Sequence, residues 1–311
     1  MIETFFQDLP HGIRLSCRAA GQVGRPVLLF LHGFPEAAFV WDALLEHFAR
    51  AENGGWRCVA PNLRGFEHSS APRDVSAYKA RHLVQDITAL IDLVTADSPT
   101  PGRLGALVAH DWGGALAWSV AARHPQRMQR LVIVNAPHPV PFRRELADSP
   151  AQQKASAYMN FLARPDAPDL LAENDFARLW PFFTAMAADS GPATWLDDAM
   201  RERYRSVWRL GLHGACHYYG ASPLRPPTAA DPGAVAVQLP PALVHVQVPT
   251  LVIWGMDDTA LPPALLDGLA DHVPDLRIEP VPGATHWIVH EQPAHVARLA
   301  GAFLAGVQSP S

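Results

Sequence analysis

The chain has 311 residues, of which 49% are hydrophobic and 18% are charged, and this balance is typical of a soluble globular enzyme and argues against a disordered chain. The net charge of −5 comes without a basic stripe, so we expect no nucleic-acid partner. The length fits one α/β core with an insertion as well as it fits two domains.

The chain begins without a basic segment followed by a long apolar one, and its longest apolar runs are strand-sized. We therefore expect no signal peptide, no membrane partner and a cytoplasmic location. Three cysteines lie far apart in the sequence, match no metal spacing and fit a reducing compartment. The histidines show no metal-ligand pattern either, so no metal and no cofactor are expected.

Short apolar runs alternate with amphipathic helical patterns, which predicts an α/β fold with a parallel sheet covered by helices. In chain order, the expected strands are Val27–Leu31, Cys58–Ala60, Leu104–Ala109, Leu131–Asn135, Thr250–Trp254 and Leu276–Val281. The expected helices are Phe39–Arg50, Ala77–Thr95, Ala115–Arg123, Pro263–His272 and Ala294–Ala305.

This alternation stops between Pro139 and about Leu239, where no strand is expected. Aromatic and arginine-rich helical patterns, such as Asn174–Met186 and Ala199–Tyr219, take its place. A proline-rich tract over residues 222–241 then leads back to the sheet pattern. We therefore expect a core in two parts, residues 1–138 and 242–311, with a helical cap at residues 139–241 between them.

The segment from Ala106 to Gly114 places an aspartate where a strand gives way to a helix. Apolar residues before Asp111 predict a buried strand, Gly113 and Gly114 are expected to allow a tight turn, and a helical pattern follows. A side chain on such an elbow is exposed to substrate. A carboxylate is ionised near neutral pH and can attack carbon without a base to activate it. Asp111 is therefore predicted to form an alkyl ester.

Hydrolysis of that ester needs a general base with a pKa near neutrality, and His286 is the candidate. An imidazole in this role needs a carboxylate that fixes its tautomer and stabilises its cationic form. Asp257 and Asp258 both lie between Asp111 and His286 in chain order. Asn135 occupies the other possible position for an acid, after a strand, and cannot carry the charge.

Four segments together resemble the α/β-hydrolase superfamily: Leu31–Glu36, Pro61–Phe66, His110–Gly114 and Gly283–Trp287. With an aspartate at the elbow, the chain is most similar to the epoxide hydrolases, and the haloalkane dehalogenases are the nearest competing branch. The resemblance spans nearly the whole chain and is strongest in the core. It implies the α/β-hydrolase fold: a mostly parallel central sheet flanked by helices, with a helical cap.

The resemblance also implies roles for individual residues. The family spacing after Gly255 points to Asp258 as the acid, and Asp257 then serves as a helix cap. The backbone N–H groups of Phe34 and Trp112 are expected to form the oxyanion hole. Both His32 and His110 are expected to brace their turns.

In the epoxide hydrolases that the chain resembles, two cap tyrosines protonate the leaving oxygen. Tyr158 and Tyr219 match these positions, and Tyr218 is the alternative if the register slips by one. Gly220 departs from the family pattern, in which an arginine is common. The substrate pocket is expected to include Phe34, Trp112, Tyr218 and Trp287.

The implied activity is hydrolysis of a small apolar epoxide by water to a vicinal diol. One alternative is a haloalkane dehalogenase, although dehalogenases tend to show an asparagine where Phe34 stands. A second alternative is a non-catalytic binding protein on a hydrolase fold, which would have no chemical need for His286. Both a monomer and a homodimer are compatible with the sequence.

Overall fold

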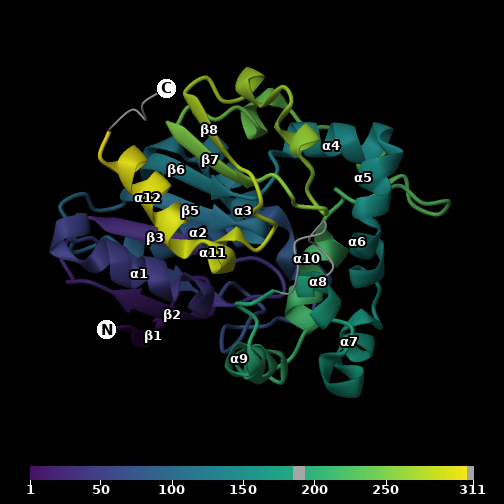
Figure 1. Cartoon of the computed structure of the whole chain (residues 1–311), viewed down its shortest axis with the longest axis horizontal. Helices are drawn as coiled ribbons and strands as arrows, with labels where there is room; N and C mark the ends of the chain where they lie inside the picture. Colours follow the sequence, from purple (N-terminus) through teal and green to yellow (C-terminus); the bar gives the residue numbers. More distant parts are fainter. Residues whose placement is uncertain (185–192, 307–311) are drawn as a thin grey trace.

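One sheet of eight strands forms the centre of the computed structural model, which describes residues 1–184 and 193–306 (Figure 1). The strand order is β1-β2-β4-β3-β5-β6-β7-β8; β2 is antiparallel to both of its neighbours, and all pairs from β4 to β8 are parallel. The strands are β1 Glu3–Asp8, β2 Arg14–Ala20, β3 Val27–Leu31, β4 Arg57–Pro61, β5 Leu104–His110, β6 Met128–Val134, β7 Thr250–Gly255 and β8 Leu276–Val281. This arrangement confirms the predicted mostly parallel sheet.

The six predicted strands correspond to β3 through β8. The first five contain short apolar runs, whereas β8 alternates apolar with charged residues. Every residue of β3, β5 and β7 is buried, as expected for strands covered on both faces. The sequence did not predict β1 and β2. β1 is an edge strand with only partly buried side chains, so no apolar run marks it.

Helices cover both faces of the sheet, with α1, α11 and α12 in front in the view of Figure 1. The core helices are α1 Asp42–Ala49, α2 Ala80–Val94, α3 Asp111–Arg123, α11 Ile288–Glu291 and α12 Pro293–Leu304. Contacts pair α1 with α12 and α2 with α3. Short 3₁₀ turns lie between core elements at η1 Ala38–Trp41, η2 Ala51–Asn53, η3 Val75–Tyr78, η4 Pro125–Arg127, η7 Pro263–Leu266 and η8 Leu269–Asp271.

The helix predicted over Pro263–His272 is wrong. The segment forms the two 3₁₀ turns η7 and η8, separated at Gly268, whose φ of +76° is left-handed. A glycine in this conformation ends a helical turn. The other four predicted core helices are present, with ends displaced by a few residues at most of their termini.

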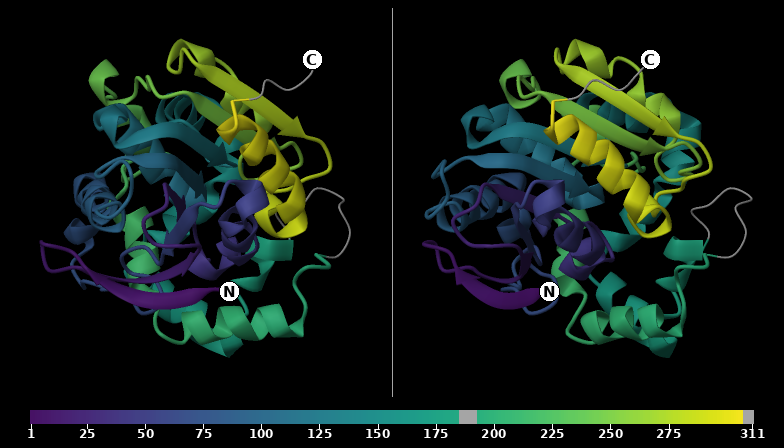
Figure 2. Two further views of the ribbon diagram at one scale, coloured as in Figure 1. Left: turned by 90° about the vertical axis from the view of Figure 1, so that its left-hand side faces the viewer. Right: turned by 60° about the vertical axis from the view of Figure 1, so that its left-hand side comes forward.

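A helical region follows β6 and occupies one side of the sheet (Figures 1 and 2). Its helices are α4 Pro139–Asp148, α5 Pro150–Ala155, α6 Ala157–Leu162, α7 Ala167–Phe176, α8 Trp180–Thr184, α9 Asp198–Trp208 and α10 His213–Ala221. The proline-rich tract holds the 3₁₀ turns η5 Gly233–Ala236 and η6 Pro241–Leu243. None of the strands among the described residues lies between β6 and β7.

Two predicted cap helices are interrupted. Asn174 adopts a left-handed conformation near the end of α7, so the predicted Asn174–Met186 helix starts only at α8, and its last two residues lie outside the described part of the chain. The predicted Ala199–Tyr219 helix is split into α9 and α10 near Gly211, whose φ is +125°.

Specific hydrogen bonds join this helical region to the core. The Trp208 indole on α9 donates to the carbonyl of Pro35 at 2.8 Å, and the Arg203 guanidinium donates to the Asp42 carboxylate on α1 at 2.7 Å. These contacts fix the cap over the carboxyl ends of the strands, where parallel α/β sheets place their sites. Within residues 1–184 and 193–306, no helix is long and apolar enough to cross a membrane.

Candidate active site

Asp111 is the first residue of α3 and follows β5 directly, at the elbow that the sequence predicted. It has a φ of +49°, an uncommon conformation for a residue with a side chain. The turn therefore depends on Asp111 itself and not, as predicted, on the glycines after it, which have no positive φ. Such a bend turns the carboxylate away from the chain's path and toward the cap.

Gly113 and Gly114 are needed for close packing instead. A Cβ atom on Gly113 would lie 2.4 Å from the Leu31 carbonyl oxygen, and one on Gly114 would lie 2.2 Å from the Ala136 Cβ. The two glycines thus allow α3 to approach the loops after its neighbouring strands. Any side chain there would displace the helix that carries Asp111.

Three predicted catalytic side chains lie together at the carboxyl ends of β5, β7 and β8. His286 Nδ1 is 2.7 Å from Asp258 Oδ2, and His286 Nε2 is 3.8 Å from Asp111 Oδ2. The first distance is a hydrogen bond, and the second is too long for one. Asp111 Oδ2 therefore faces the imidazole without a hydrogen bond to it.

Neighbouring carboxylates control the protonation of His286, whose side chain is 5% exposed. Burial alone would lower its pKa, but the negative charges of Asp258 and Asp111 raise the pKa to about 9. Part of this increase depends on the charge of Asp111. Esterification of Asp111 would remove that charge and lower the pKa of His286 toward the range of a general base.

Of the two adjacent aspartates, Asp258 contacts His286, and several other donors hold its carboxylate. Its Oδ1 accepts the backbone N–H groups of Ala260 and Leu261 at 2.9 and 2.8 Å. Its Oδ2 accepts from Asn135 Nδ2 at 2.8 Å as well as from His286. Asn135, considered in the sequence only as an excluded acid, thus helps to hold the Asp258 carboxylate.

The two predicted oxyanion-hole donors lie beside Asp111. The Phe34 N–H donates to Asp111 Oδ1 at 2.7 Å. Trp112 is the second residue of α3, where a backbone N–H has no partner within the helix. Gly33 makes room for this contact, because a Cβ atom there would lie 2.2 Å from Asp111 Oδ1.

The two predicted cap tyrosines share a cavity with Asp111. Tyr158 on α6 and Tyr219 on α10 have ring centroids 6.1 Å apart, and both line the cavity. Burial raises the pKa of both hydroxyls, and the charge of Asp111 acts in the same direction. Both therefore keep their protons at neutral pH. The hydroxyl of Tyr218, the alternative, instead donates to the Arg64 carbonyl at 3.0 Å.

This cavity has a volume of about 340 Å³, and its wall is mostly apolar. Of the four residues predicted to line it, Trp112 and Tyr218 do so. Phe34 packs edge-on against Tyr219, and the Trp287 indole donates to the Phe182 carbonyl at 3.0 Å; neither belongs to the lining found among the described residues.

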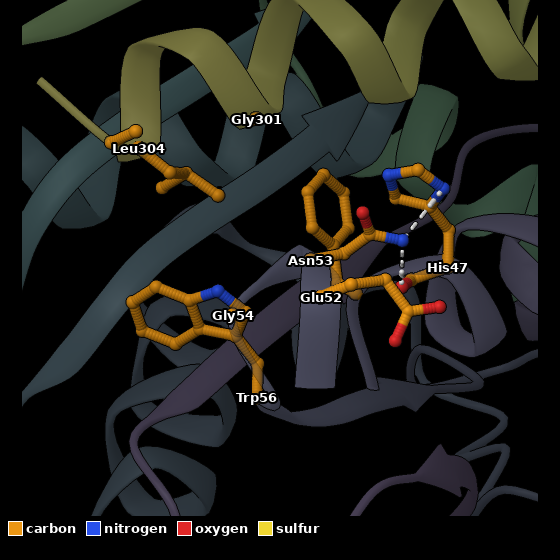
Figure 3. Close-up of a pocket in the computed structure, with 9 residues that line it drawn as sticks. His47, Glu52, Asn53, Gly54, Trp56, Gly301 and Leu304 are labelled. Atoms are coloured by element: carbon orange, nitrogen blue, oxygen red, sulfur yellow. Dashed lines mark hydrogen bonds between the residues drawn. The ribbon is translucent and has the colours of Figure 1, made fainter. Parts of the chain in front are cut away.

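A second pocket of similar volume, about 330 Å³, lies between the end of α1 and the end of α12 (Figure 3). His47, Asn53 and Trp56 are among its lining residues. Trp56 immediately precedes β4, so this pocket is at the amino end of that strand, whereas Asp111 follows the carboxyl end of β5. The two pockets have similar volumes, so volume does not show which one is the functional site. The pocket that contains Asp111 is the candidate, because His286 and Asp258 lie beside it.

A buried polar cluster behind the site was not predicted. The Glu36 carboxylate contacts His110 Nδ1 at 3.0 Å, His290 Nε2 at 2.8 Å and the Tyr204 hydroxyl at 3.2 Å. Burial would raise the pKa of Glu36, but the hydrogen bonds from the two histidines hold it well below its usual range. In the sequence, only the position of Glu36 next to Pro35, in the turn after a strand, could have indicated that its carboxylate is buried among histidines.

The cluster reaches His286 through His110, whose Nε2 lies 2.9 Å from the His286 carbonyl oxygen. The two ring nitrogens of His110 thus lie between the Glu36 carboxylate and the His286 carbonyl oxygen. His32 also has a bracing position, as predicted, because its Nε2 accepts the Leu63 N–H at 3.1 Å. Within residues 1–184 and 193–306, no group of three or more metal-ligating side chains is arranged to hold a metal ion.

Comparison with known proteins places this site in a family context. The model of the alpha/beta hydrolase fold matches residues 26–293. An alpha/beta hydrolase superfamily protein of Bacillus subtilis is 31% identical over 292 residues, which cover 93% of each chain. Epoxide hydrolase 3 of Xenopus tropicalis is 33% identical over 300 residues, covering 94% of this chain and 75% of the relative. The crystal structure of the Bacillus megaterium epoxide hydrolase with an inhibitor has a TM-score of 0.84 at 28% identity, covering 97% of this chain and all of the other.

Proposed function

The chain belongs to the alpha/beta hydrolase family and is a hydrolase homologous to epoxide hydrolases, and we propose that it converts an epoxide to a vicinal diol through an ester on Asp111. The observation that carries the proposal is the shared cavity, in which Tyr158 and Tyr219 lie on the cap side and Asp111 on the core side. A nucleophile for carbon and two proton donors for oxygen are the groups that epoxide opening requires.

In the first step, Asp111 Oδ2 attacks the less hindered epoxide carbon and the ring C–O bond breaks. The electron pair of that bond moves to the oxygen, which takes a proton from Tyr158 or Tyr219. The raised pKa values of these hydroxyls suit them to an alkoxide, which is basic enough to remove the proton. The product of this step is a hydroxyalkyl ester.

In the second step, His286 takes a proton from water, and the resulting hydroxide attacks the carbonyl carbon of the ester. Esterification has by then removed the charge of Asp111 and so lowered the pKa of His286, which increases the fraction of neutral imidazole that can accept this proton. The N–H groups of Phe34 and Trp112 stabilise the oxyanion. When the intermediate collapses, the ester C–O bond breaks and the His286 imidazolium returns its proton to the departing oxygen, which releases the diol. The second proton of the attacking water passes to the tyrosine that gave up its own, and Asp111 is a carboxylate again.

A haloalkane dehalogenase is the alternative that keeps the same nucleophile. A departing halide needs N–H donors and no proton, whereas the cavity presents two protonated tyrosines. Phe34 offers no side-chain N–H where dehalogenases tend to have an asparagine. Halide release from a panel of haloalkanes, measured by ion chromatography beside diol formation from an aromatic epoxide, separates the two activities.

The trapping experiment uses His286→Gln with an aromatic epoxide. We expect an adduct of one substrate mass on the peptide that contains Asp111, detected by mass spectrometry, together with loss of turnover. His272→Gln is the control, since His272 is half-buried and stacks on His138 away from the triad, and it should turn over without an adduct. Normal diol formation by His286→Gln without an adduct would contradict the proposed mechanism.

A further inference from the structure

Tyr219 lies near the carboxyl end of α10, where the helix cannot satisfy its backbone carbonyl. A regular helix would do so with the N–H group of the residue four positions later, but that residue is Pro223, which has no N–H. Because Tyr219 is buried, its carbonyl oxygen needs another donor. Nη1 of Arg225 donates to this oxygen at 3.1 Å. A side chain of the proline-rich tract thus holds the residue that carries one of the proposed proton donors.

Contacts on both its side chain and its backbone hold Arg225 itself. Its Nη2 donates to Asp231 Oδ2 at 2.7 Å, and its side chain is 17% exposed. Its carbonyl accepts the Ala234 N–H at 2.9 Å. A glycine is needed at position 233, because a Cβ atom on Gly233 would lie 2.5 Å from the Arg225 carbonyl oxygen. The guanidinium is therefore fixed where it meets α10, and its positive charge suits the negative end of the helix dipole.

The next residue of the tract contacts the helix that carries the other tyrosine. The Pro226 carbonyl accepts from Asn160 Nδ2 at 3.1 Å, and Asn160 lies on α6 two residues after Tyr158. The helices α6 and α10 are neighbours in the cap (Figure 1). Arg225 and Pro226 thus join the two helices that carry Tyr158 and Tyr219.

We propose that Arg225 is a positioning residue for epoxide opening, which together with Pro226 fixes the hydroxyls of Tyr158 and Tyr219 relative to one another and to Asp111. This inference rests on the proposed epoxide hydrolysis and adds a residue outside the cavity lining found among the described residues. Both hydroxyls must reach one epoxide oxygen, and a proton donor misplaced by about 1 Å loses much of its effect. A shift of either helix would therefore slow the ring opening.

The test measures ester formation and ester hydrolysis separately in the wild type, Arg225→Ala and Arg225→Lys. A single turnover of an aromatic epoxide is quenched at successive times, and mass spectrometry quantifies the ester on the peptide that contains Asp111. We expect ester formation to slow about ten- to a hundredfold in Arg225→Ala, whereas hydrolysis, which depends on His286, keeps its rate. Arg225→Lys should recover part of the loss, because an ammonium can still donate to the Tyr219 carbonyl.

A second measurement separates proton donation from a general loss of structure. Epoxypropane and its trifluoromethyl analogue, trifluoroepoxypropane, have similar sizes, but the fluorinated alkoxide is less basic and needs less help from a proton donor. The slowing caused by Arg225→Ala should therefore be smaller with trifluoroepoxypropane. Equal slowing with both epoxides, or equal slowing of ester formation and hydrolysis, would contradict the positioning of the proton donors by Arg225.

Arg178→Ala is the matched control. Its Nε donates to the Leu170 carbonyl at 3.1 Å and its Nη2 to Glu173 at 3.2 Å, both on α7, a helix that carries neither tyrosine. This variant thus loses the same two kinds of contact elsewhere in the cap and should form the ester at the wild-type rate. Equal losses in Arg178→Ala and Arg225→Ala would overturn the specific role of Arg225, as would a wild-type rate of ester formation in Arg225→Ala.

Amide hydrogen exchange tests the link between the two helices without any substrate. We expect Arg225→Ala to weaken the protection of both α6 and α10, and Arg178→Ala to leave both unchanged. Unchanged protection of the two helices in Arg225→Ala would refute the link. If no epoxide reacts with the wild type while the expected exchange pattern holds, the proposed activity fails and the link between the helices stands.

Discussion

Raising the pH through the titration of His286 is expected to destabilise the fold. The pKa of this side chain is raised from 6.5 to about 9 in the folded protein by Asp258 and Asp111, against the effect of burial. A group whose folded pKa is raised stabilises the folded state fully below its unfolded pKa, and this contribution is lost as the pH rises through the folded pKa. The difference of about 2.5 units corresponds to about 3 kcal/mol of unfolding free energy.

The measurement is urea unfolding at several pH values between about 6 and 10 for the wild type and His286→Gln. Other groups titrate in both proteins, so the difference between the two unfolding free energies isolates His286. We expect this difference to shift by about 3 kcal/mol against the wild type as the pH rises from about 6.5 to above 9. A difference that stays constant over this range would refute the assignment of a stabilised imidazolium between the two carboxylates.

Three further substitutions test the surroundings of the site. Glu36→Gln removes a buried carboxylate that contacts two histidines, so it should lower the unfolding free energy measured in urea titrations by about 3 kcal/mol. An unchanged urea midpoint would contradict a stabilising role for this cluster. Asn135→Ala removes a hydrogen-bond donor to Asp258, so it should lower the unfolding free energy by about 1–3 kcal/mol and slow ester hydrolysis in single-turnover kinetics. A variant with the stability and the hydrolysis rate of the wild type would contradict this role of Asn135. Gly113→Ala should prevent stable folding, because the new Cβ atom would lie 2.4 Å from the Leu31 carbonyl oxygen. Gly301→Ala in α12 is the control and should be tolerated, because the nearest atom to its new Cβ is 3.6 Å away. Equal melting temperatures of the two variants in thermal melts would contradict this expectation.

The centre of the parallel sheet could be predicted because β3, β5 and β7 are buried on both faces and appear as nearly continuous apolar runs. The position of Asp111 on an elbow followed from the same pattern, since a strand, two glycines and a helical segment are local features. The cause of the bend at Asp111 could not be predicted from the sequence. It required the positive φ of Asp111 and the contacts of Gly113 with Leu31, which belongs to a strand far away in sequence.

Long-range polar contacts account for what the sequence left out. Tyr204 and His290 meet Glu36 across more than 160 and 250 residues of chain, and no local spacing encodes this contact. Asn135 could be excluded as an acid from its chemistry, but its hydrogen bond to Asp258 depends on β6 lying beside β7.

The covalent ester on Asp111 is the central claim, and a single turnover in water enriched in the heavy oxygen isotope tests it most directly. Enzyme in excess over an aromatic epoxide is quenched after one turnover, and the isotope is located by mass spectrometry. If the ester forms, the oxygen added to the first diol comes from Asp111, so the diol is unlabelled and the peptide containing Asp111 gains the heavy oxygen. A labelled first diol with an unlabelled peptide would mean that water attacks the epoxide directly and would contradict the account.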